Sequence, residues 1–275
     1  MRLLTFRESG STQAGRVEGD LVVELDYPDV GAILEADELG RVRMATGPRR
    51  QLEGLELAPP VVRPPKIVCI GQNYLAHIQE QNVKVPDYPT IFPKWPRTLV
   101  GPADDVLLPA ISERADWEVE LAFYIGHELR HASIEESLAG IAGYTILNDV
   151  SVRDWQWRTS QWLQGKTWER TTPVGPALVS PDEVDGAADL LLRCEIDGEV
   201  VQEARTEDLL FRPADIVAYL STILTLEPGD LVSTGTPGGV GAGRQPPVFL
   251  EPGQVVRTTI EGLGELVNEC VAEPV

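Results

Sequence analysis

Cysteine is scarce in this chain: its 275 residues include three, Cys69, Cys194 and Cys270. The number is odd, and no two of them have the CxxC spacing of a metal-binding or redox pair. The sequence therefore predicts neither a disulfide framework nor a structural zinc site. We expect three reduced and mostly buried thiols.

Long apolar runs are also lacking. No stretch approaches the roughly 18 consecutive apolar residues that a membrane-spanning helix needs. At the N-terminus, Arg2, Arg7 and Glu8 surround an apolar run that is too short for the core of a signal peptide. We therefore expect a protein that stays in the cytoplasm and does not enter a membrane.

Positive charge is the third deficit. Lys and Arg number 23 against 43 Asp and Glu, which gives a formal net charge of −20 at pH 7. A surface this acidic repels phosphate backbones and anionic lipid headgroups, so nucleic acids and membrane surfaces are disfavoured as partners. Hydrophobic residues make up 43% of the chain, which is enough for a folded core.

Prolines divide the chain into two units. Four of them fall between residues 59 and 65, a pattern that resists both helix and central strand. The residues before them show short strand patterns at 2–6 and 16–25 and a short helix pattern at 29–39. We predict a small N-terminal α+β domain at residues 1–60 and a larger domain at residues 61–275.

The dominant pattern in the larger domain is β-strand. Apolar runs rich in β-branched residues occur at 66–71, 118–126, 143–150, 192–196, 230–235 and 255–260. Asp197-Gly198 is a type I′ hairpin signal, and one amphipathic helix is expected at 213–224 with Pro213 at its first position. Because strands and helices do not alternate regularly, we predict a β-dominated α+β fold.

An HExxH motif runs from His127 to His131. Its two histidines can bind zinc only if they share one face of a helix. Here a strand-like run ends at Gly126, and the capping-box pattern of Ser133 and Glu136 predicts that the next helix begins after the motif. The sequence therefore disfavours a zinc metalloprotease and favours solvated turn residues.

Three carboxylates follow strand patterns. Glu118 and Glu120 stand at i and i+2, so on a strand both point to one face, and Asp149 ends the apolar run 143–150. From spacing alone, an exposed strand edge with solvated acids is the simpler interpretation. If the three carboxylates meet, oxygen ligands without histidine suit Mg²⁺ or Mn²⁺ better than zinc.

Further polar residues follow in a segment rich in tryptophan, namely Arg153, Gln156 and Lys166. An aromatic patch beside polar surface would explain this segment as well as a binding site would. The glycine-rich run 234–241 offers backbone N–H groups to an anion, but it lacks the Lys-Ser/Thr of a P-loop. Alone, it predicts a loop.

His77 and Glu80 stand at i and i+3, which makes them neighbours if that segment is helical. Such a pair is more often a feature of the surface than a catalytic dyad.

The order of all these motifs along the chain changes the interpretation, because together they resemble the fumarylacetoacetate hydrolase family. The strings that carry the resemblance are GQNYLAHIQE, FPKWPRTLVGP, DWEVELAFYIG, AGYTILNDVSVRDWQ, QGKTW, LEPGDLVSTGTPGGVG and IEGLGELVN.

The resemblance covers residues 66–271, and the first 60 residues resemble, more weakly, the small N-terminal domain of some bacterial members. It implies a mixed β-sandwich roll with that small α+β domain attached, and a homodimer. In the family, the positions of Glu118, Glu120 and Asp149 hold a divalent metal, so the resemblance implies Mg²⁺ or Mn²⁺ as cofactor.

The resemblance also assigns roles to the remaining residues. It implies that His77 and Glu80 form a general-base pair on a lid, and that Lys166 is the active-site lysine. The residues that it implies for substrate binding are Arg153, Gln156 and Thr236, with Lys94 around the same pocket. Trp95 departs from the family pattern, in which a smaller residue often follows the lysine, and we expect it to change the shape of the acyl pocket.

These residues imply an enzyme that acts on a small anionic 2-oxo acid. The activity expected is metal-dependent hydrolysis of a carbon–carbon bond in an acylpyruvate, through an enolate that the metal stabilises. Two alternatives use the same enolate: decarboxylation of an oxaloacetate-type acid, and isomerisation of a 2-hydroxy-diene-dioate. A ligand-binding module that retains the fold without turnover is a third.

Overall fold

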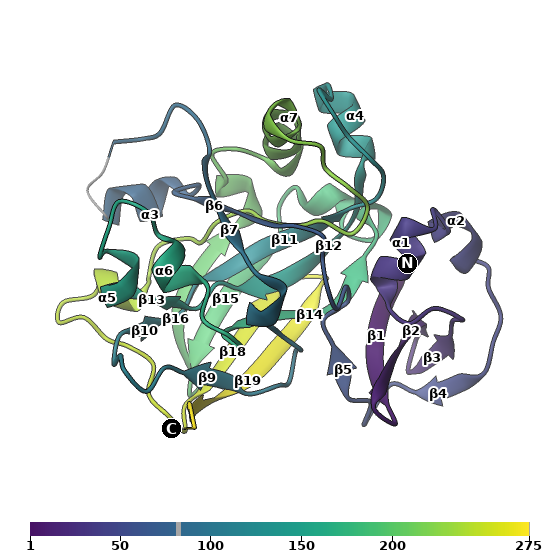
Figure 1. Ribbon diagram of the computed structural model, residues 1–275, viewed down its shortest axis with the longest axis horizontal. Coiled ribbons are helices and arrows are strands. Elements are labelled where there is room, and N and C mark those ends of the chain that lie inside the picture. Colours follow the sequence, from purple (N-terminus) through teal and green to yellow (C-terminus); the bar gives the residue numbers. More distant parts are fainter. Residues whose placement is uncertain (81–83, 275) are drawn as a thin grey trace.

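The computed structural model describes residues 1–80 and 84–274, with the side chains of His77 and Glu80 outside the described part. Over this part the chain forms a 12-stranded sheet, a five-stranded sheet and a two-stranded ladder, with short helices around them (Figure 1). The β-dominated α+β class predicted from the sequence is confirmed.

The first 58 residues extend the large sheet. They contain strands β1 (Arg2–Glu8), β2 (Ser11–Glu18), β3 (Leu21–Glu24), β4 (Arg49–Gln51) and β5 (Leu57–Ala58), and helices α1 (Val30–Glu35) and α2 (Leu39–Val42). Asp29 caps α1 by accepting a hydrogen bond from Ala32 N at 2.9 Å. Residues 59–65 form neither helix nor strand. The division into two domains at residue 60 stays a prediction.

The rest of the large sheet holds the centre of the molecule. Its strands are β6 (Ile67–Gly71), β7 (Thr90–Lys94), β8 (Leu99–Val100), β11 (Val119–Ile125), β12 (Ile141–Asn148), β14 (Thr172–Val179) and β17 (Leu231–Ser233). The order is β4-β3-β2-β1-β14-β12-β11-β17-β6-β7, with β5 beside β1 and β8 beside β14. The pairings β6–β17 and β8–β14 are parallel and the others are antiparallel, so the sheet is mixed.

A second sheet packs against the first. Its order is β16-β15-β18-β19-β9, and its strands are β9 (Val106–Leu108), β15 (Leu191–Ile196), β16 (Glu199–Arg205), β18 (Val255–Ile260) and β19 (Gly264–Ala272). The turn between β15 and β16 has φ of 52° at Asp197 and 85° at Gly198, as a type I′ hairpin requires. The separate ladder joins β10 (Ala115–Asp116) to β13 (Ser151–Val152).

Strand β11 shows how the two layers form. Val119, Leu121 and Phe123 point to the core between the sheets, which also contains side chains of β15, β18 and β19. Ala122 and Tyr124 point the other way, into a core shared with α1. This period of two places Glu118 and Glu120 together on one face, as their spacing predicts.

The helices are short. The remaining ones are α3 (Leu75–Glu80), α4 (Ile134–Ala139), α5 (Arg153–Gln156), α6 (Leu163–Lys166) and α7 (Pro213–Ile223). Helix α7 confirms the amphipathic helix predicted at 213–224, although Ile223 is 54% exposed. In the described part of the chain, no helix is both long and apolar enough to cross a membrane.

Helix α4 begins where the capping box predicts, with Ser133 and Glu136 bonded reciprocally. His127 and His131 therefore lie before it, in a non-helical segment. The two histidines do not share a helix face, which is the context that the zinc motif needs.

Candidate metal centre

Glu118, Glu120 and Asp149 meet because two neighbouring segments run antiparallel. Strands β11 and β12 pair with Val119 opposite Asn148, and Asp149 N donates to Glu118 O at 2.8 Å just beyond the ladder. One ligand oxygen from each of the three carboxylates lies within 4.8 Å of the other two. All three residues are buried, so the interpretation as solvated acids at an exposed strand edge is wrong.

Two lysines and an arginine form ion pairs with two of the three carboxylates, Glu118 and Asp149. Lys166 Nζ lies 2.5 Å from Glu118 Oε2 and 2.7 Å from Asp149 Oδ2. Arg153 Nη1 lies 2.7 Å from Glu118 Oε1, and Lys94 Nζ lies 2.5 Å from Asp149 Oδ1. Burial alone would lower the pKa of Lys166, but the carboxylates of Asp149 and Glu118 outweigh it and hold that pKa above its usual value.

Glu120 differs from the other two carboxylates. Over the described residues it forms no ion pair, and its Oε2 accepts hydrogen bonds from Ser233 Oγ and from Gly235 N at 2.9 Å. Burial raises the pKa of Glu120, and the negative charges of Asp149 and Glu118 raise it further. A buried carboxylate without its own cation beside two others is what a divalent cation would neutralise, so the donor set fits Mg²⁺ or Mn²⁺.

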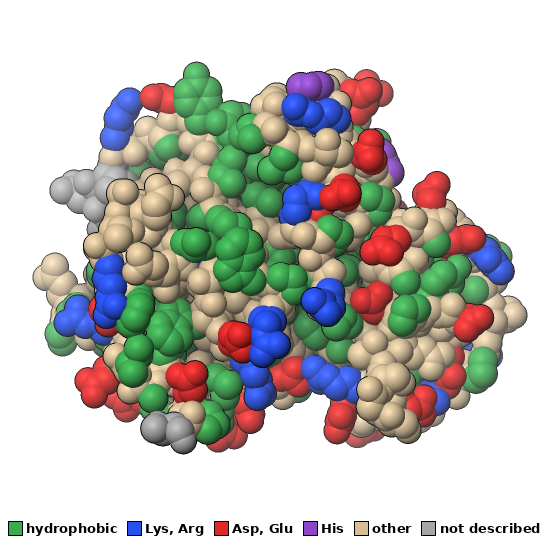
Figure 2. Space-filling view, in the orientation of Figure 1, with side chains coloured by type: hydrophobic (Ala, Val, Ile, Leu, Met, Phe, Trp, Pro, Cys, Tyr) green, Lys and Arg blue, Asp and Glu red, His purple; other side chains and the backbone are tan. Residues whose placement is uncertain are grey.

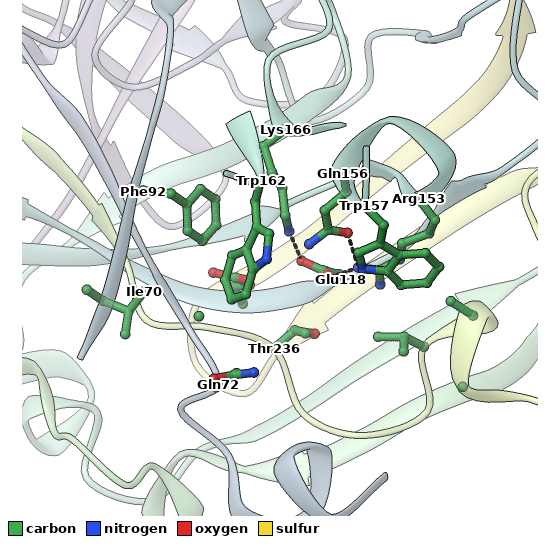
Figure 3. Close-up of a pocket in the computed structure, with 15 residues that line it drawn as sticks. Ile70, Gln72, Phe92, Glu118, Arg153, Gln156, Trp157, Trp162, Lys166 and Thr236 are labelled. Carbon is green, nitrogen blue, oxygen red and sulfur yellow. Dashed lines mark hydrogen bonds and ion pairs between the residues drawn. The ribbon is translucent and has the colours of Figure 1, made fainter. Parts of the chain in front are cut away.

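Glu118 and Glu120 form part of the wall of a cavity of about 380 Å³, whereas Asp149 is not among its lining residues (Figure 3). Among the residues that the sequence predicts, Glu118, Glu120, Arg153, Gln156, Lys166 and Thr236 line this cavity. Sequence reasoning missed several other lining residues: Ile70, Gly71, Gln72, Phe92, Trp162, Val240, Ala242 and Gly243. Trp162 lies in the tryptophan-rich segment and Val240 in the glycine-rich run 234–241, but local pattern does not show which residues of these segments face a cavity.

An aromatic wall closes one side of the cavity. The rings of Phe92 and Trp162 meet edge to face with centroids 5.6 Å apart, and Lys166 Nζ lies 5.0 Å from the Phe92 centroid. In Figure 3 both rings lie beside the Lys166 ammonium group. Gly71 permits this packing, because a Cβ atom at that position would lie 2.3 Å from the Trp162 ring.

Four predicted residues lie elsewhere or outside the described part. Lys94 is buried behind Asp149 and is not among the residues that line the cavity, so its role in substrate binding stays a prediction. Trp95, which we expected at the acyl pocket, is 51% exposed and lines a separate groove with Pro65 and Leu224. The side chains of His77 and Glu80, on α3, belong to the residues that are not described.

Two buried polar residues support the cavity from behind. Asp116 accepts hydrogen bonds from Arg153 Nε at 2.8 Å and from Gly241 N at 2.7 Å. Gln202 accepts one from Val119 N at 3.0 Å and donates to Thr236 Oγ1 at 2.9 Å. A signal for Asp116 was available, because it extends the i, i+2 alternation of Glu118 and Glu120 by one step. Gln202 carries no such signal.

Comparison with known proteins decides the family. Residues 66–271 match the family model described as fumarylacetoacetate (FAA) hydrolase C-terminal. The chain belongs to the fumarylacetoacetate hydrolase family. The resemblance seen in the sequence is thereby confirmed, as is the expectation of an enzyme fold, since the family's model covers the segment that holds every residue of the cavity.

Members of the family with different reactions are similar to this chain. The human protein named oxaloacetate tautomerase FAHD2A, mitochondrial, is 48% identical over 214 residues, which are 77% of this chain and 68% of that protein. A 2-hydroxyhepta-2,4-diene-1,7-dioate isomerase from Mycobacterium marinum is 35% identical, with a TM-score of 0.82 over the whole of both chains.

A third relative shows a ligand and a metal. The maleylpyruvate hydrolase from Sphingobium sp. SYK-6, solved in complex with manganese(II) and pyruvate, is 29% identical over the whole of both chains, with a TM-score of 0.82. The three relatives share the family and differ in the reaction named. Membership of the family therefore shows that this chain belongs with enzymes, but it does not decide which reaction the chain catalyses.

Proposed function

We propose that this protein is a divalent-metal-dependent enzyme that interconverts the keto and enol forms of a small 2-oxo acid, with oxaloacetate as its first candidate substrate. The observation that carries the proposal is the buried set of Glu118, Glu120 and Asp149, of which the two glutamates line a cavity together with Lys166 and Arg153. The human oxaloacetate tautomerase, at 48% identity, supports this choice of substrate.

The cofactor proposed is Mg²⁺ or Mn²⁺. A divalent cation held by the three carboxylates would polarise the carboxylate and keto oxygens of a 2-oxo acid, which lowers the free energy of the enolate. Over the described residues, the ion pairs of this region join Asp116, Glu118 and Asp149 to Lys94, Arg153 and Lys166, whereas Glu120 has none. The bound cation makes the site suitable for an anionic substrate.

The chain's own residues supply electrostatic stabilisation. Lys166 has three N–H groups, of which two are directed to Glu118 and Asp149, and we assign the third to an oxygen of the substrate. Because two carboxylates hold its ammonium group, we assign Lys166 the role of a hydrogen-bond donor rather than that of a base. Thr236 Oγ1 accepts from Gln202, so its own hydrogen is available to the cavity.

The proton on carbon needs a base, and His77 is our candidate. The motif places it on α3 with Glu80 one turn later, and the resemblance gives this pair the role of a general base. We propose the same pair for a second candidate reaction, hydrolysis of acylpyruvates, in which it would deprotonate the attacking water. The maleylpyruvate hydrolase with pyruvate bound supports keeping this candidate.

One set of assays separates the reactions. We would measure tautomerisation of oxaloacetate, its decarboxylation and pyruvate release from a panel of acylpyruvates, each with Mg²⁺ or Mn²⁺, for the wild type and for E118A/E120A. We expect metal-dependent tautomerisation that the double variant lacks. Turnover of no substrate above the double variant would contradict the proposal, and metal-dependent binding without turnover would support a ligand-binding module instead.

The H77A variant tests whether His77 acts as a general base or only as a structural residue of the lid. We expect it to reduce hydrolysis more than decarboxylation, because decarboxylation needs no attacking water. Equal losses in both reactions would indicate a structural lid residue.

The homodimer and the cytoplasmic location remain predictions. Sedimentation would test the first, and localisation of the tagged protein would test the second. The human relative is named as mitochondrial.

A further inference from the structure

The hydrogen bonds of Arg153 leave one of its nitrogen atoms without a partner. The guanidinium has five N–H groups. Nε donates to Asp116 Oδ2 at 2.8 Å, while Nη1 donates to Gln156 Oε1 at 2.9 Å and lies 2.7 Å from Glu118 Oε1. Over the described residues, the buried Nη2 has no hydrogen-bond partner.

An unpartnered charged nitrogen in this position calls for an acceptor. Arg153 is 2% exposed and lines the cavity, so bulk water is not its usual neighbour. Leaving a buried donor of a charged group unsatisfied is costly, and such exceptions are rare in folded proteins. An anionic oxygen of a ligand in the cavity would be attracted to the positive charge that Arg153 brings to the wall.

Asp116 fixes the position of the Arg153 guanidinium through its Nε atom. It is fully buried, and besides Arg153 Nε it accepts hydrogen bonds from the backbone N–H groups of Gly241 at 2.7 Å and Ala242 at 2.9 Å. Ala242 lines the cavity as well. One carboxylate therefore holds two parts of the cavity wall, the guanidinium and the loop that contains residues 241–242.

The backbone makes this connection rigid. Asp116 pairs with Ser151 in the β10–β13 ladder, and Arg153 N donates to Arg114 O at 2.9 Å. The backbone segments that carry Asp116 and Arg153 are therefore hydrogen-bonded to each other beside the ion pair. Gly241 allows the loop to approach, since a Cβ there would lie 1.9 Å from Val248 O and 2.9 Å from Asp116 Oδ1.

We propose that Asp116 is a positioning residue for substrate binding. It holds the Arg153 guanidinium and the 241–242 backbone in one arrangement on the cavity wall, where the guanidinium binds an anionic oxygen of the 2-oxo acid. The proposal rests on the proposed function of the cavity. Asp116 lies outside the set of three metal-binding carboxylates, so its contribution is to the ligand and not to the metal.

The experiment is a double-mutant cycle on oxalate binding. Calorimetry would measure Mn²⁺ alone, and then oxalate at saturating Mn²⁺, for the wild type, D116N, R153K and D116N/R153K. An asparagine fills the same space but turns an NH₂ group towards N–H donors. We expect D116N to weaken oxalate roughly 10- to 100-fold, the effect of losing a hydrogen bond to a charged group, and to change Mn²⁺ affinity much less.

The cycle shows whether Asp116 acts through Arg153. In the R153K background, we expect D116N to cost far less than in the wild type, because the residue that it positions is gone. D154N is the matched control: Asp154 adjoins Arg153 in the chain but bonds Ser112 Oγ, and its replacement should leave oxalate binding unchanged. Thermal unfolding of each variant measures the structural cost separately.

The outcomes separate this inference from the proposed function. Additive losses in the cycle, or a loss of Mn²⁺ affinity in D116N as large as that of oxalate, would overturn the positioning role. A wild type that binds oxalate with Mn²⁺ but turns over no 2-oxo acid would contradict the proposed function and leave the positioning role supported. A wild type that binds Mn²⁺ but no oxalate would overturn both.

Discussion

The ammonium group of Lys166 lies 2.5 Å from Glu118 Oε2, at the position where the chain also offers its carboxylates to a cation. The same nitrogen contacts Asp149, so one lysine engages two of the three candidate metal ligands. Lysine and metal therefore compete for the same negative charge, although the lysine is also the proposed donor to the substrate.

The K166M variant should bind metal more tightly and turn over substrate more slowly. Removing a buried positive charge beside two carboxylates strengthens their attraction for a divalent cation, and we expect Mn²⁺ affinity to rise about 10-fold. Loss of the donor should lower kcat by about 10²- to 10³-fold. Calorimetry and the oxaloacetate assay measure the two effects.

The control for K166M is K66M. Lys66 forms ion pairs with Glu227 and Asp230 and does not line the cavity, so its removal should change neither quantity. A K166M variant with weaker metal binding would show that the lysine organises the carboxylates rather than competing for them.

In the E120Q variant, bound metal should raise the free energy of unfolding much less than it does in the wild type. Glu120 is the buried carboxylate without an ion pair in the described structure, and its amide isostere cannot supply the charge. At a metal concentration of 100 times Kd, the wild type should gain about 2.7 kcal/mol in the free energy of unfolding. Thermal scans with and without Mn²⁺ test this, and an equal gain in E120Q would argue against Glu120 as a ligand.

The aromatic wall makes a prediction about substrate size. In W162A the cavity loses the ring that faces Phe92, and we expect kcat/KM for long acyl chains to rise about 10-fold relative to short ones. G71A should displace Trp162 and reduce turnover, because its Cβ would overlap the ring. G40A is the matched control, as a Cβ at Gly40 meets no atom within 4 Å. Unchanged selectivity in W162A would place the acyl group elsewhere.

The three thiols predict the response to alkaline pH. Burial raises the pKa of Cys69, of Cys194 and, to about 12, of Cys270, from an ordinary value of 9.0. The unfolded chain therefore releases these protons at a lower pH than the folded protein does. The contribution of the thiols to stability is complete below pH 9 and falls above it, by about 1.4 kcal/mol per pH unit for each thiol until that thiol ionises in the folded state.

Denaturant titrations between pH 8 and 11 measure this slope, and a C69A/C194A/C270A variant should reduce it. At pH 8, a thiol reagent should label the unfolded chain and leave the folded protein unlabelled, because the thiolate is the reactive form. Rapid labelling of the folded protein would show that one thiol is accessible.

The sequence predicted those parts of the site that depend on local pattern. Alternation along residues 118–126 puts two carboxylates on one face, and the capping box at Ser133 ends the non-helical segment of the HExxH motif. Both follow from backbone geometry over a few residues. The burial of the carboxylates does not, because it depends on which distant side chains cover the strand.

Contacts between distant segments explain what the sequence could not give. Lys94 is a strand residue whose ammonium reaches Asp149 only after β6, β17 and β11 have aligned. Trp95 follows it directly but is 51% exposed, in a groove with Pro65 and Leu224. Exposed hydrophobic side chains also gather in places on the face shown in Figure 2. The neighbouring strands determine that one of these two adjacent residues is buried and the other exposed. A local sequence pattern does not contain this information.

The register that joins β10 and β11 to β12 and β13 also bears on the order of folding. Asp116, Glu118, Glu120 and Asp149 all lie on or directly beside these two consecutive antiparallel pairs, whereas Lys94 and Lys166 arrive from outside them. If the hairpin closes first, the acids meet before both lysines do, and their mutual repulsion opposes closure. Arg153, carried by the hairpin itself, is the one cation of this network that assembles with the acids from the start.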